Sequence, residues 1–326
     1  MYSWGKDDTA GWKNPGGYKY DEAKAPYLED LAKKAEKEGP RTYSKKKEPN
    51  MKLVDPKGKT ISTQSKNPLI FGIDGTGSTQ KWPAEFFDRA PLLYQTLSQY
   101  RDDVEIAFSV IGDAVADDFP LQVADFDKGV GLNAKLKALH GEGRGGPGIR
   151  ESYELFAYFM LEHAKTPNAE KPFLFILGDE KFYDAVNPAQ VKKYISDEMQ
   201  EMSSLKVWQE LSKKYDVRLL HKEYPGRDEE VLSQWREAIG AQNIVPIYDS
   251  LRVVDVAMGL VAKSWGHFDD FEKNLGARQD SQNKSVVMES LRVAPEFAEG
   301  MKSNYKSAVT AGKSKKSKSL LDKSQK

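Results

Sequence analysis

A short apolar run followed at once by carboxylate and hydroxyl side chains stands at residues 69–78: Leu69-Ile70-Phe71-Gly72-Ile73-Asp74-Gly75-Thr76-Gly77-Ser78. The apolar half predicts a strand that is buried on both faces. Asp74, Thr76 and Ser78 follow at alternate positions. Because alternate residues of an extended segment point the same way, these three side chains can converge on one point. The run therefore predicts a polar site at the carboxyl end of a buried strand.

Five more apolar runs alternate with stretches of helical periodicity. This alternation is typical of an α/β fold, a doubly wound, mostly parallel six-stranded sheet with helices on both faces. The connection between residues 104–111 and 121–126 is too short for a crossover helix, so we expect that pair to be antiparallel at the sheet edge. The expected strands are 69–73, 104–111, 121–126, 173–177, 217–220 and 244–247, and the expected helices are 84–100, 132–139, 149–165, 204–214, 229–239 and 250–264.

The helix expected at 149–165 carries aromatic side chains on nearly every face, among them Tyr153. Such a helix is expected to lie between the sheet and its neighbours, with its aromatic side chains in the core. Two shorter helices are expected after the sheet, at 268–275 and 281–292.

Composition divides the chain into four expected segments: an N-terminal arm (1–66), the α/β domain (67–265), a helical appendix (266–300) and a disordered Lys/Ser tail (301–326). In the arm, Asp21 is expected to cap a helix that continues to about Lys37. The runs 51–54 and 59–62 flank Asp55-Pro56-Lys57-Gly58, which predicts a β-hairpin.

The composition excludes several classes of protein. The 326 residues include no Cys, which excludes disulfides, zinc-thiolate sites, iron–sulfur clusters and cysteine nucleophiles. No run approaches the roughly 18 apolar residues of a membrane span, and the first residues lack the apolar segment of a secretory signal. We therefore expect a cytoplasmic protein.

The 49 basic and 49 acidic residues are unevenly distributed. Residues 1–66 carry 15 Lys and Arg against 10 Asp and Glu, and residues 302–326 carry eight against one. The basic ends therefore flank an acidic middle, an asymmetry that can steer association with a partner. The tail has no Arg and, after Tyr305, no aromatic residue, so nucleic-acid binding is not expected from it.

A second carboxylate is expected beside the first. Asp179 follows the strand at 173–177, and the carboxyl ends of parallel strands meet at one edge of a sheet. A Gly-rich loop at 141–148 precedes Glu151, which can add another oxygen. Hard oxygen ligands suit Mg²⁺ or Mn²⁺. The acidic run Asp113, Asp117 and Asp118 either deepens a negative patch at this edge or forms a solvated turn.

These positions resemble the metal-ion-dependent adhesion site of von Willebrand factor A domains, over residues 67 to about 265. The family motif is Asp-x-Ser/Thr-x-Ser after the first strand, a Gly-rich loop with a Thr or acidic ligand, and an Asp after the fourth strand. Asp74, Thr76 and Ser78 match the first element, and Asp179 matches the last. The antiparallel edge strand also fits the family's topology. The likeness is greatest to cytoplasmic bacterial members, among which are partners of MoxR-type AAA+ ATPases.

The sequence departs from this pattern in two places. Pro147 and Gly148 follow the Gly-rich run where the family has a Thr, so Glu151 or a water is the expected replacement. Gly178 and Glu180 stand where the family often has Thr and Gly.

The resemblance implies a non-catalytic interaction module, a scaffold or adaptor with no catalytic residues. In it a Mg²⁺ or Mn²⁺ held by Asp74, Thr76, Ser78, Asp179 and Glu151 keeps one position open for an acidic side chain of a partner protein. The partner that the resemblance names is a MoxR-type AAA+ ATPase.

Two other interpretations compete with this one. The same motif resembles haloacid dehalogenase-type phosphatases, with Asp74 as nucleophile, Asp179 and Asp184 on Mg²⁺, and Lys171 holding the phosphate. Against it, Thr76 stands where most of these enzymes carry their general acid. The plainest alternative is that Asp74 and Asp179 simply cap the following helices.

Overall fold

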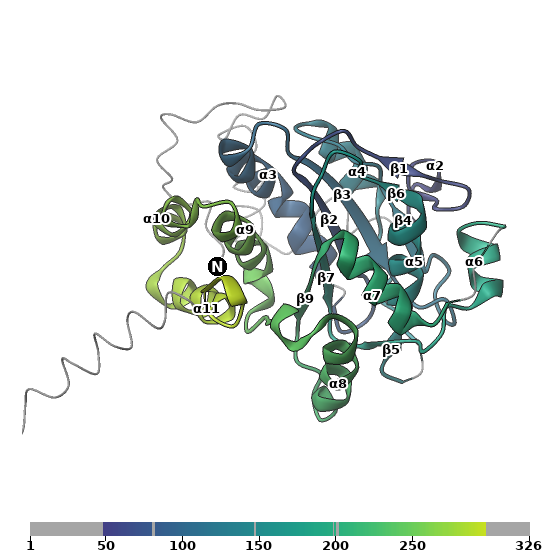
Figure 1. The fold of residues 1–326 in the computed structure, drawn as a ribbon. Helices are drawn as coiled ribbons and strands as arrows, with labels where there is room; N and C mark the ends of the chain where they lie inside the picture. The colour runs from purple at the N-terminus through teal and green to yellow at the C-terminus, as the bar shows by residue number, and fades with distance from the viewer. Residues whose placement is uncertain (1–47, 80–81, 147, 198, 200–201, 298–326) are drawn as a thin grey trace, which may run out of the picture.

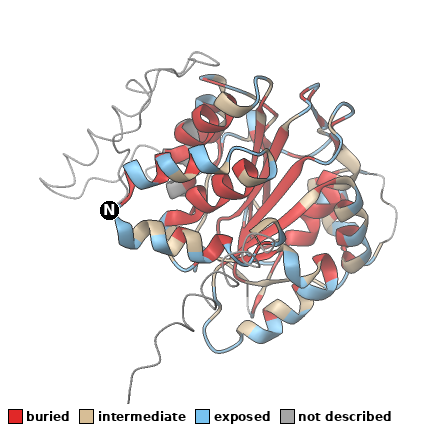
Figure 2. Ribbon diagram, turned by 60° about the vertical axis from the view of Figure 1, so that its left-hand side comes forward, coloured by how far each residue is buried: buried red, intermediate tan, exposed pale blue. Residues whose placement is uncertain are grey.

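A computed structural model describes residues 48–79, 82–146, 148–197, 199 and 202–297 (Figure 1). The helix expected from Asp21 to Lys37 and the tail at 301–326 lie outside these residues. Within them the elements form a central sheet with helices on both sides, and red, buried residues fill the strands and the inner faces of the helices (Figure 2).

The central sheet has six strands in the order β10-β9-β7-β2-β3-β4. All neighbours are parallel except β3 and β4, which are antiparallel at one edge. This confirms the predicted fold class. The strands are β2 (Pro68–Asp74), β3 (Glu105–Ile111), β4 (Leu121–Val123), β7 (Phe173–Gly178), β9 (Asp216–His221) and β10 (Ile244–Pro246).

Alternate residues of β2 face two separate cores, as the pleat requires. Leu69, Phe71 and Ile73 pack with the helices of one face, and Ile70 with those of the other. The first face carries α3 (Trp82–Tyr100), α4 (Gly131–Ala138) and α9 (Val253–Ser264), and the second carries α5 (Tyr153–His163), α7 (Ser204–Lys214) and α8 (Asp228–Ile239). β2 is therefore buried on both faces, as its apolar run predicts.

Helix α5 is shorter than its aromatic run suggests. The prediction of a helix over 149–165 is wrong at both ends. At its start β5 (Arg150–Glu151) pairs with β8 (Lys181–Phe182), and after its last turn β6 (Ala164–Lys165) pairs with β1 (Ile61–Ser62). Backbone partners from distant segments thus replace helical hydrogen bonds at each end.

The hairpin predicted within residues 51–62 is also wrong. Residues 51–54 form a helical turn, α2 (Met51–Val54), and β1 pairs with β6, far along the chain. Val54 is fully buried in the main core, and Nζ of Lys59 donates to the backbone oxygen of Val123. Tertiary contacts therefore override the local turn signal.

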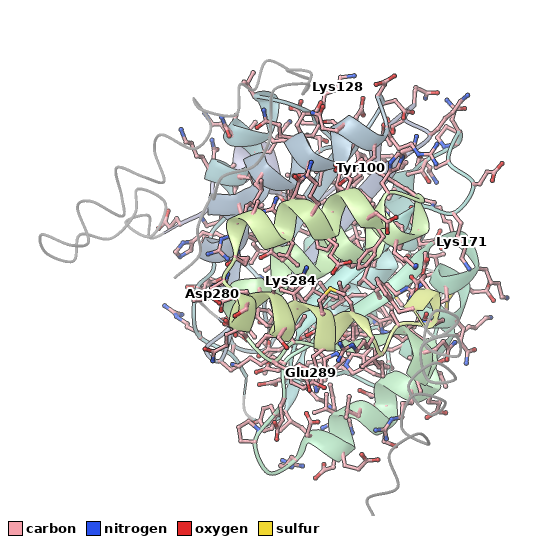
Figure 3. The ribbon with its side chains drawn as sticks, turned by 90° about the vertical axis from the view of Figure 1, so that its left-hand side faces the viewer. Tyr100, Lys128, Lys171, Asp280, Lys284 and Glu289 are labelled. Carbon is pink, nitrogen blue, oxygen red and sulfur yellow. The ribbon has the colours of Figure 1, made fainter. Side chains whose placement is uncertain are left out.

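After the sheet, α10 (Phe268–Arg278) and α11 (Ser281–Leu291) confirm the two helices expected there; Lys284 and Glu289 of α11 are labelled in Figure 3. Both contact α9, and Phe271, Leu275 and Leu291 belong to the same core cluster as the first face of the sheet. The remaining elements are α6 (Pro188–Tyr194), which was not predicted, and two 3-10 turns (Ala241–Asn243 and Ser250–Arg252). In the described part of the chain, no helix combines the length and the apolar character needed to cross a membrane.

Candidate metal centre

The predicted site residues come from two neighbouring strands that end at the same edge of the sheet. Asp74 is the last residue of β2, and Asp179 directly follows β7, its parallel neighbour. The two carboxylates are close enough that Asp179 raises the pKa of Asp74. The expectation that two distant stretches of chain bring carboxylates to one edge is therefore met in the structure.

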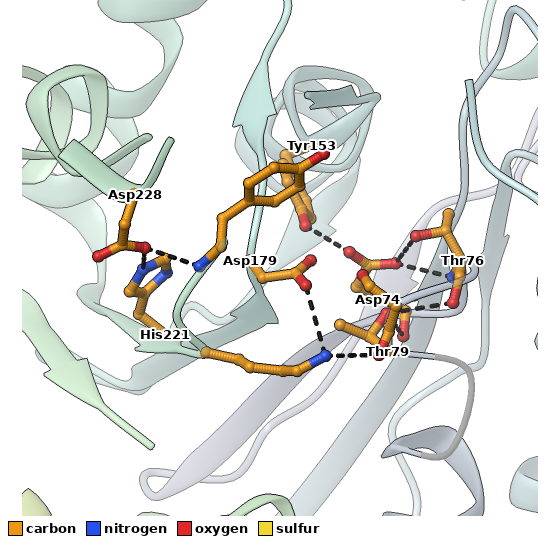
Figure 4. A network of polar contacts seen from close by, with 10 residues as sticks. Asp74, Thr76, Thr79, Tyr153, Asp179, His221 and Asp228 are labelled. Atoms are coloured by element: carbon orange, nitrogen blue, oxygen red, sulfur yellow. Dashed lines mark hydrogen bonds and ion pairs between the residues drawn. The ribbon is translucent and has the colours of Figure 1, made fainter. Parts of the chain in front are cut away.

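Asp74 is fully buried and held from both sides (Figure 4). Its Oδ1 accepts hydrogen bonds from the backbone nitrogen (2.8 Å) and the hydroxyl (2.6 Å) of Thr76. Its Oδ2 accepts a 2.5 Å hydrogen bond from the hydroxyl of Tyr153. Burial, and secondarily Asp179, raises the pKa of Asp74 to about 6. Both oxygens thus have donors, which fix the orientation of the carboxylate.

Tyr153 is a site residue that the sequence did not reveal, because it was expected only in the core. It is the first residue of α5, and Gly178 leaves the space that its hydroxyl needs. A Cβ on Gly178 would lie 2.2 Å from the Tyr153 hydroxyl oxygen. The absence of a side chain at position 178 therefore leaves room for a tyrosine that donates to Asp74.

Among the described residues, only one of the two carboxylate oxygens of Asp179 has an ion-pair or hydrogen-bond partner. Its side chain is 1% exposed, Oδ1 has no hydrogen-bond partner among the described residues, and Oδ2 lies 3.6 Å from Nζ of Lys222. Burial raises the pKa of Asp179 despite the opposing effects of the Ser78 side chain and of Lys222. Ser78 itself is exposed, so the structure places it at the rim of the site.

Glu151 lies near Thr76, next to the Gly-rich loop. A Cβ on Gly145 would stand 3.0 Å from Oε1 of Glu151 and 3.5 Å from Cβ of Thr76. Glu151 is buried, and its Oε2 has no partner among the described residues. Burial, with Asp74 as the next cause, raises the pKa of Glu151 to about 11. Glu151 therefore belongs to the same cluster as Asp74 and Thr76.

The Gly-rich loop packs directly on the β2 loop. The backbone nitrogen of Gly77 donates to the oxygen of Arg144 (2.6 Å), and that of Gly143 donates to the oxygen of Gly75 (2.9 Å). These bonds place residues 143–145 over the turn that carries Thr76. The loop that the sequence identified thus forms one wall of the site through its backbone.

The acidic run after β3 is part of the site, so the alternative of a solvated turn is wrong for two of its three residues. Asp113 and Asp117 are buried, whereas Asp118 is exposed and pairs with Arg144. Oδ2 of Asp113 and Oδ1 of Asp117 have no partners in the described part of the chain. Burial raises the pKa of Asp117 to about 6.

Two further carboxyls at this edge were not predicted. Glu154 is fully buried on α5, and Glu180 follows Asp179. Burial raises the pKa of each to about 8. The sequence offered a weak signal for both, since each is an acidic residue next to a predicted site residue or inside an apolar helix.

The donor set suits a hard cation. Seven carboxyl groups of the described residues surround the ends of β2, β3 and β7: Asp74, Asp113, Asp117, Glu151, Glu154, Asp179 and Glu180. Among the described residues, only Lys222 forms an ion pair with any of the seven. Burying carboxylates without cations is costly, and a divalent cation offsets that cost. No three His, Asp or Glu side chains of the described residues converge closely enough to coordinate a cation by themselves. Hydroxyl groups and waters must therefore complete any coordination shell, as Mg²⁺ readily allows.

The competing interpretations find no support in these positions. Lys171 precedes β7, at the end of the strand opposite Asp179, so its expected role as a phosphate clamp is wrong. Asp184 is exposed and pairs with Arg150. Helix capping is wrong as well, because α3 begins eight residues after Asp74 and a strand, not a helix, follows Asp179.

Comparison with known proteins gives only distant structural likenesses. No family model and no curated protein matches the chain. Proximal thread matrix protein 1 from the mussel byssus is 9% identical, over 64% of this chain and 49% of that one, with a TM-score of 0.44; the same protein has been solved with a zinc-occupied MIDAS motif. The pilus adhesin SpaC from Lactobacillus rhamnosus GG is 10% identical, over 67% and 31%, with a TM-score of 0.42. A von Willebrand factor type A protein from Catenulispora acidiphila is 17% identical, over 62% and 43%, with a TM-score of 0.37. The matches thus span less than half of each of these chains, and function has to be inferred from the site itself.

Proposed function

We propose that this chain is a von Willebrand A-type interaction module that binds a partner protein through a divalent cation, Mg²⁺ or Mn²⁺, at the carboxyl edge of its sheet. The module recognises and does not turn over a substrate. Its role is that of a scaffold or adaptor.

One observation carries the proposal: buried carboxylate oxygens that lack a hydrogen-bond partner in the described part of the chain lie at the same sheet edge as the hydroxyl groups of the Asp74-x-Thr76-x-Ser78 motif. Oδ1 of Asp179 and Oε2 of Glu151 are the two such atoms that belong to predicted ligand residues. An unpaired buried carboxylate destabilises a fold unless a cation or a proton compensates it. The free energy of burying these carboxylates is spent when the chain folds, so a cation that binds here stabilises them without a further cost of burial.

Each side chain has a role in this arrangement. The Thr76 hydroxyl donates a hydrogen bond to Asp74. The lone pairs of the Thr76 oxygen are therefore free to face a cation. Tyr153 and Thr76 hold the Asp74 carboxylate in one orientation, as groups around a metal ligand commonly do. Ser78, at the rim of the same loop, supplies a further oxygen. Asp179 supplies one from the end of β7, and Glu151 takes the place of the missing threonine.

A bound cation would supply positive charge at the rim and an open coordination position for a carboxylate. A partner side chain of Asp or Glu suits this position, because a charge-assisted contact in a partly desolvated site is strong and directional. We propose a protein with such an exposed acidic residue as the partner, and a MoxR-type AAA+ ATPase is the candidate that the sequence resemblance suggests.

Metal binding is tested first, with Mn²⁺ alone. Titration of the full chain with Mn²⁺, followed by the electron paramagnetic resonance of the free ion, is expected to show saturable binding that Asp179→Asn weakens at least about tenfold. Asp118→Asn is the matched control, because the same charge is removed from an exposed ion pair that contributes little. Binding that is equal in all three proteins would refute the metal site.

Partner capture is tested second. The immobilised chain is expected to retain its partner in Mg²⁺, to release it in EDTA and to recover it when Mg²⁺ is added back. Asp179→Asn should lose this retention and Asp118→Asn should keep it. Retention that neither EDTA nor Asp179→Asn affects would show that recognition does not use the metal.

A further inference from the structure

Lys222 places a positive charge inside the acidic site. It is the first residue after β9, the strand next to β7, and its backbone nitrogen donates to the oxygen of Gly178. Its Nζ donates a 2.6 Å hydrogen bond to the backbone oxygen of Ser78 and lies 3.6 Å from Oδ2 of Asp179. The ammonium therefore joins the β2 loop to the end of β7, where the cation ligands meet.

This placement makes Lys222 a partial substitute for a metal ion. It touches a residue from each of the two strand ends on which the predicted ligands lie, Ser78 and Asp179. It also supplies one charge where a divalent cation supplies two. Even with the ammonium in place, Oδ1 of Asp179 has no hydrogen-bond partner among the residues that the structure describes. The lysine thus compensates the acidic cluster only in part.

The ammonium group of Lys222 can also move away from Asp179 into solvent. Its side chain is 32% exposed, whereas the Asp179 side chain is 1% exposed. A flexible four-carbon stem lets the ammonium move to solvent without disturbing the backbone that anchors it. Asp179, in contrast, is fixed in the fold.

We propose that Lys222 is an internal competitor of the divalent cation, which must displace the ammonium from Asp179 in order to bind. The inference rests on the proposed metal site and deepens it, since it names the residue that sets the affinity of that site. A like charge at about 4 Å opposes cation binding strongly in a partly desolvated environment. Lys222 therefore lowers the affinity of the site for the metal alone. A carboxylate of the partner adds binding free energy when it coordinates the metal, so metal and partner together displace the ammonium more readily than the metal does by itself.

The test compares the Mn²⁺ dissociation constants of Lys222→Met and Lys222→Arg with that of the unchanged full chain, again by electron paramagnetic resonance. Lys222→Met keeps the stem and removes the charge, and we expect it to bind Mn²⁺ about tenfold more tightly. Lys222→Arg keeps the charge and is expected to stay within about threefold of the unchanged chain.

Lys171→Met is the matched control. It removes the same charge from the opposite end of β7, where the side chain is exposed, so it reports any effect of net charge alone. We expect it to change Mn²⁺ affinity less than about twofold, because exposed charges at that range are screened.

Thermal unfolding gives a readout that does not depend on affinity. Without metal, Lys222→Met is expected to unfold at a lower temperature than the unchanged chain, because Asp179 loses its only cation among the described residues. With saturating Mn²⁺ the variant should gain more stability than the unchanged chain. Should Lys222→Met fold poorly, Lys222→Gln offers a second neutral variant.

The outcomes separate this inference from the metal site. If Asp179→Asn abolishes Mn²⁺ binding while Lys222→Met binds as the unchanged chain does or more weakly, the competitor role is wrong and the metal site stands. If neither the unchanged chain nor any variant binds Mn²⁺, the metal site and the competitor role of Lys222 are both wrong. Equal tightening in Lys222→Met and Lys171→Met would reduce the effect to net charge and would also overturn the inference.

Discussion

The hydroxyl of Tyr153 donates a 2.5 Å hydrogen bond to Oδ2 of Asp74, across the gap between the start of α5 and the end of β2. Both side chains are fully buried. Burial, followed by the charges of Asp74 and Asp179, raises the pKa of the Tyr153 hydroxyl, so this group stays a donor. The bond joins the buried helix of one sheet face to the residue on which the candidate site depends.

Removing that donor should destabilise the protein. Tyr153→Phe keeps the ring and leaves Oδ2 of Asp74 without its donor, so we expect the free energy of unfolding to fall by about 1–3 kcal/mol. Urea denaturation measures it. Tyr248→Phe is the control, because Tyr248 is exposed, and it should change stability by less than about 0.5 kcal/mol. A loss in Tyr153→Phe no larger than the control's would show that the bond contributes little.

Gly178→Ala should move Tyr153 away from Asp74. The new Cβ would lie 2.2 Å from the tyrosine oxygen and 2.7 Å from its Cζ, so side chain or backbone must shift. Overpacking of this kind costs about 1–3 kcal/mol, and we also expect weaker Mn²⁺ binding since Asp74 loses its orientation.

The comparison for that substitution is Gly276→Ala on α10. There the nearest atoms to a new Cβ are 3.6 Å away, at the flexible end of Lys284. Alanine in a helix is favoured over glycine by up to about 1 kcal/mol. Denaturation should therefore show a loss at position 178 and no loss at position 276; losses of equal size would contradict the close contact.

Glu154 gives a pH dependence with a definite sign. Burial raises its pKa from 4.5 to about 8, so the folded chain holds a proton that the unfolded chain has lost between those values. Its contribution to stability is therefore complete below about pH 4.5 and is lost as the pH rises through about 8. Glu154→Gln stays neutral throughout, and the amide oxygen can still accept from the backbone nitrogen of Tyr183.

We expect Glu154→Gln to be more stable than the unchanged chain at pH 8.5, and this advantage to shrink toward pH 4.5. Thermal unfolding in metal-free buffers across that range measures it. Glu229→Gln, on the exposed side of α8, is the control and should show no such trend. An advantage that does not depend on pH would mean that Glu154 is charged in the folded protein.

Leu291 tests whether the last helices fold together with the sheet. It is fully buried on α11, and a Cβ on Gly259 of α9 would come within 2.6 Å of its Cδ1, so the two helices are in close contact. Leu291→Ala should cost about 2–5 kcal/mol and lower the midpoint of a single unfolding transition. A separate early transition for α10 and α11, with the midpoint of the sheet unchanged, would contradict this coupling.

The sequence by itself determined the architecture of the sheet. Apolar runs of strand length, the short link between β3 and β4, and the amphipathic stretches between strands indicated all six strands of the central sheet and most of its helices, because hydrophobic periodicity reports burial directly. They did not indicate α6, and they placed both ends of α5 wrongly. It also indicated that Asp74 and Asp179 would meet, since both follow parallel strands and such strands end at one edge.

Tertiary structure alone decided which other groups join them. In the sequence, Tyr153 and Glu154 look like part of an apolar helix, and Asp113 and Asp117 look like a turn. Lys222 follows a strand, and nothing in the sequence indicates that its side chain lies beside Asp179. The hydrophobic pattern around a residue predicts whether the residue is buried. It does not predict which segments from distant parts of the chain pack against it. Pairs such as β1 with β6, or the Tyr153 hydroxyl over Gly178, join residues from separate parts of the chain, so only the packed molecule brings them into contact.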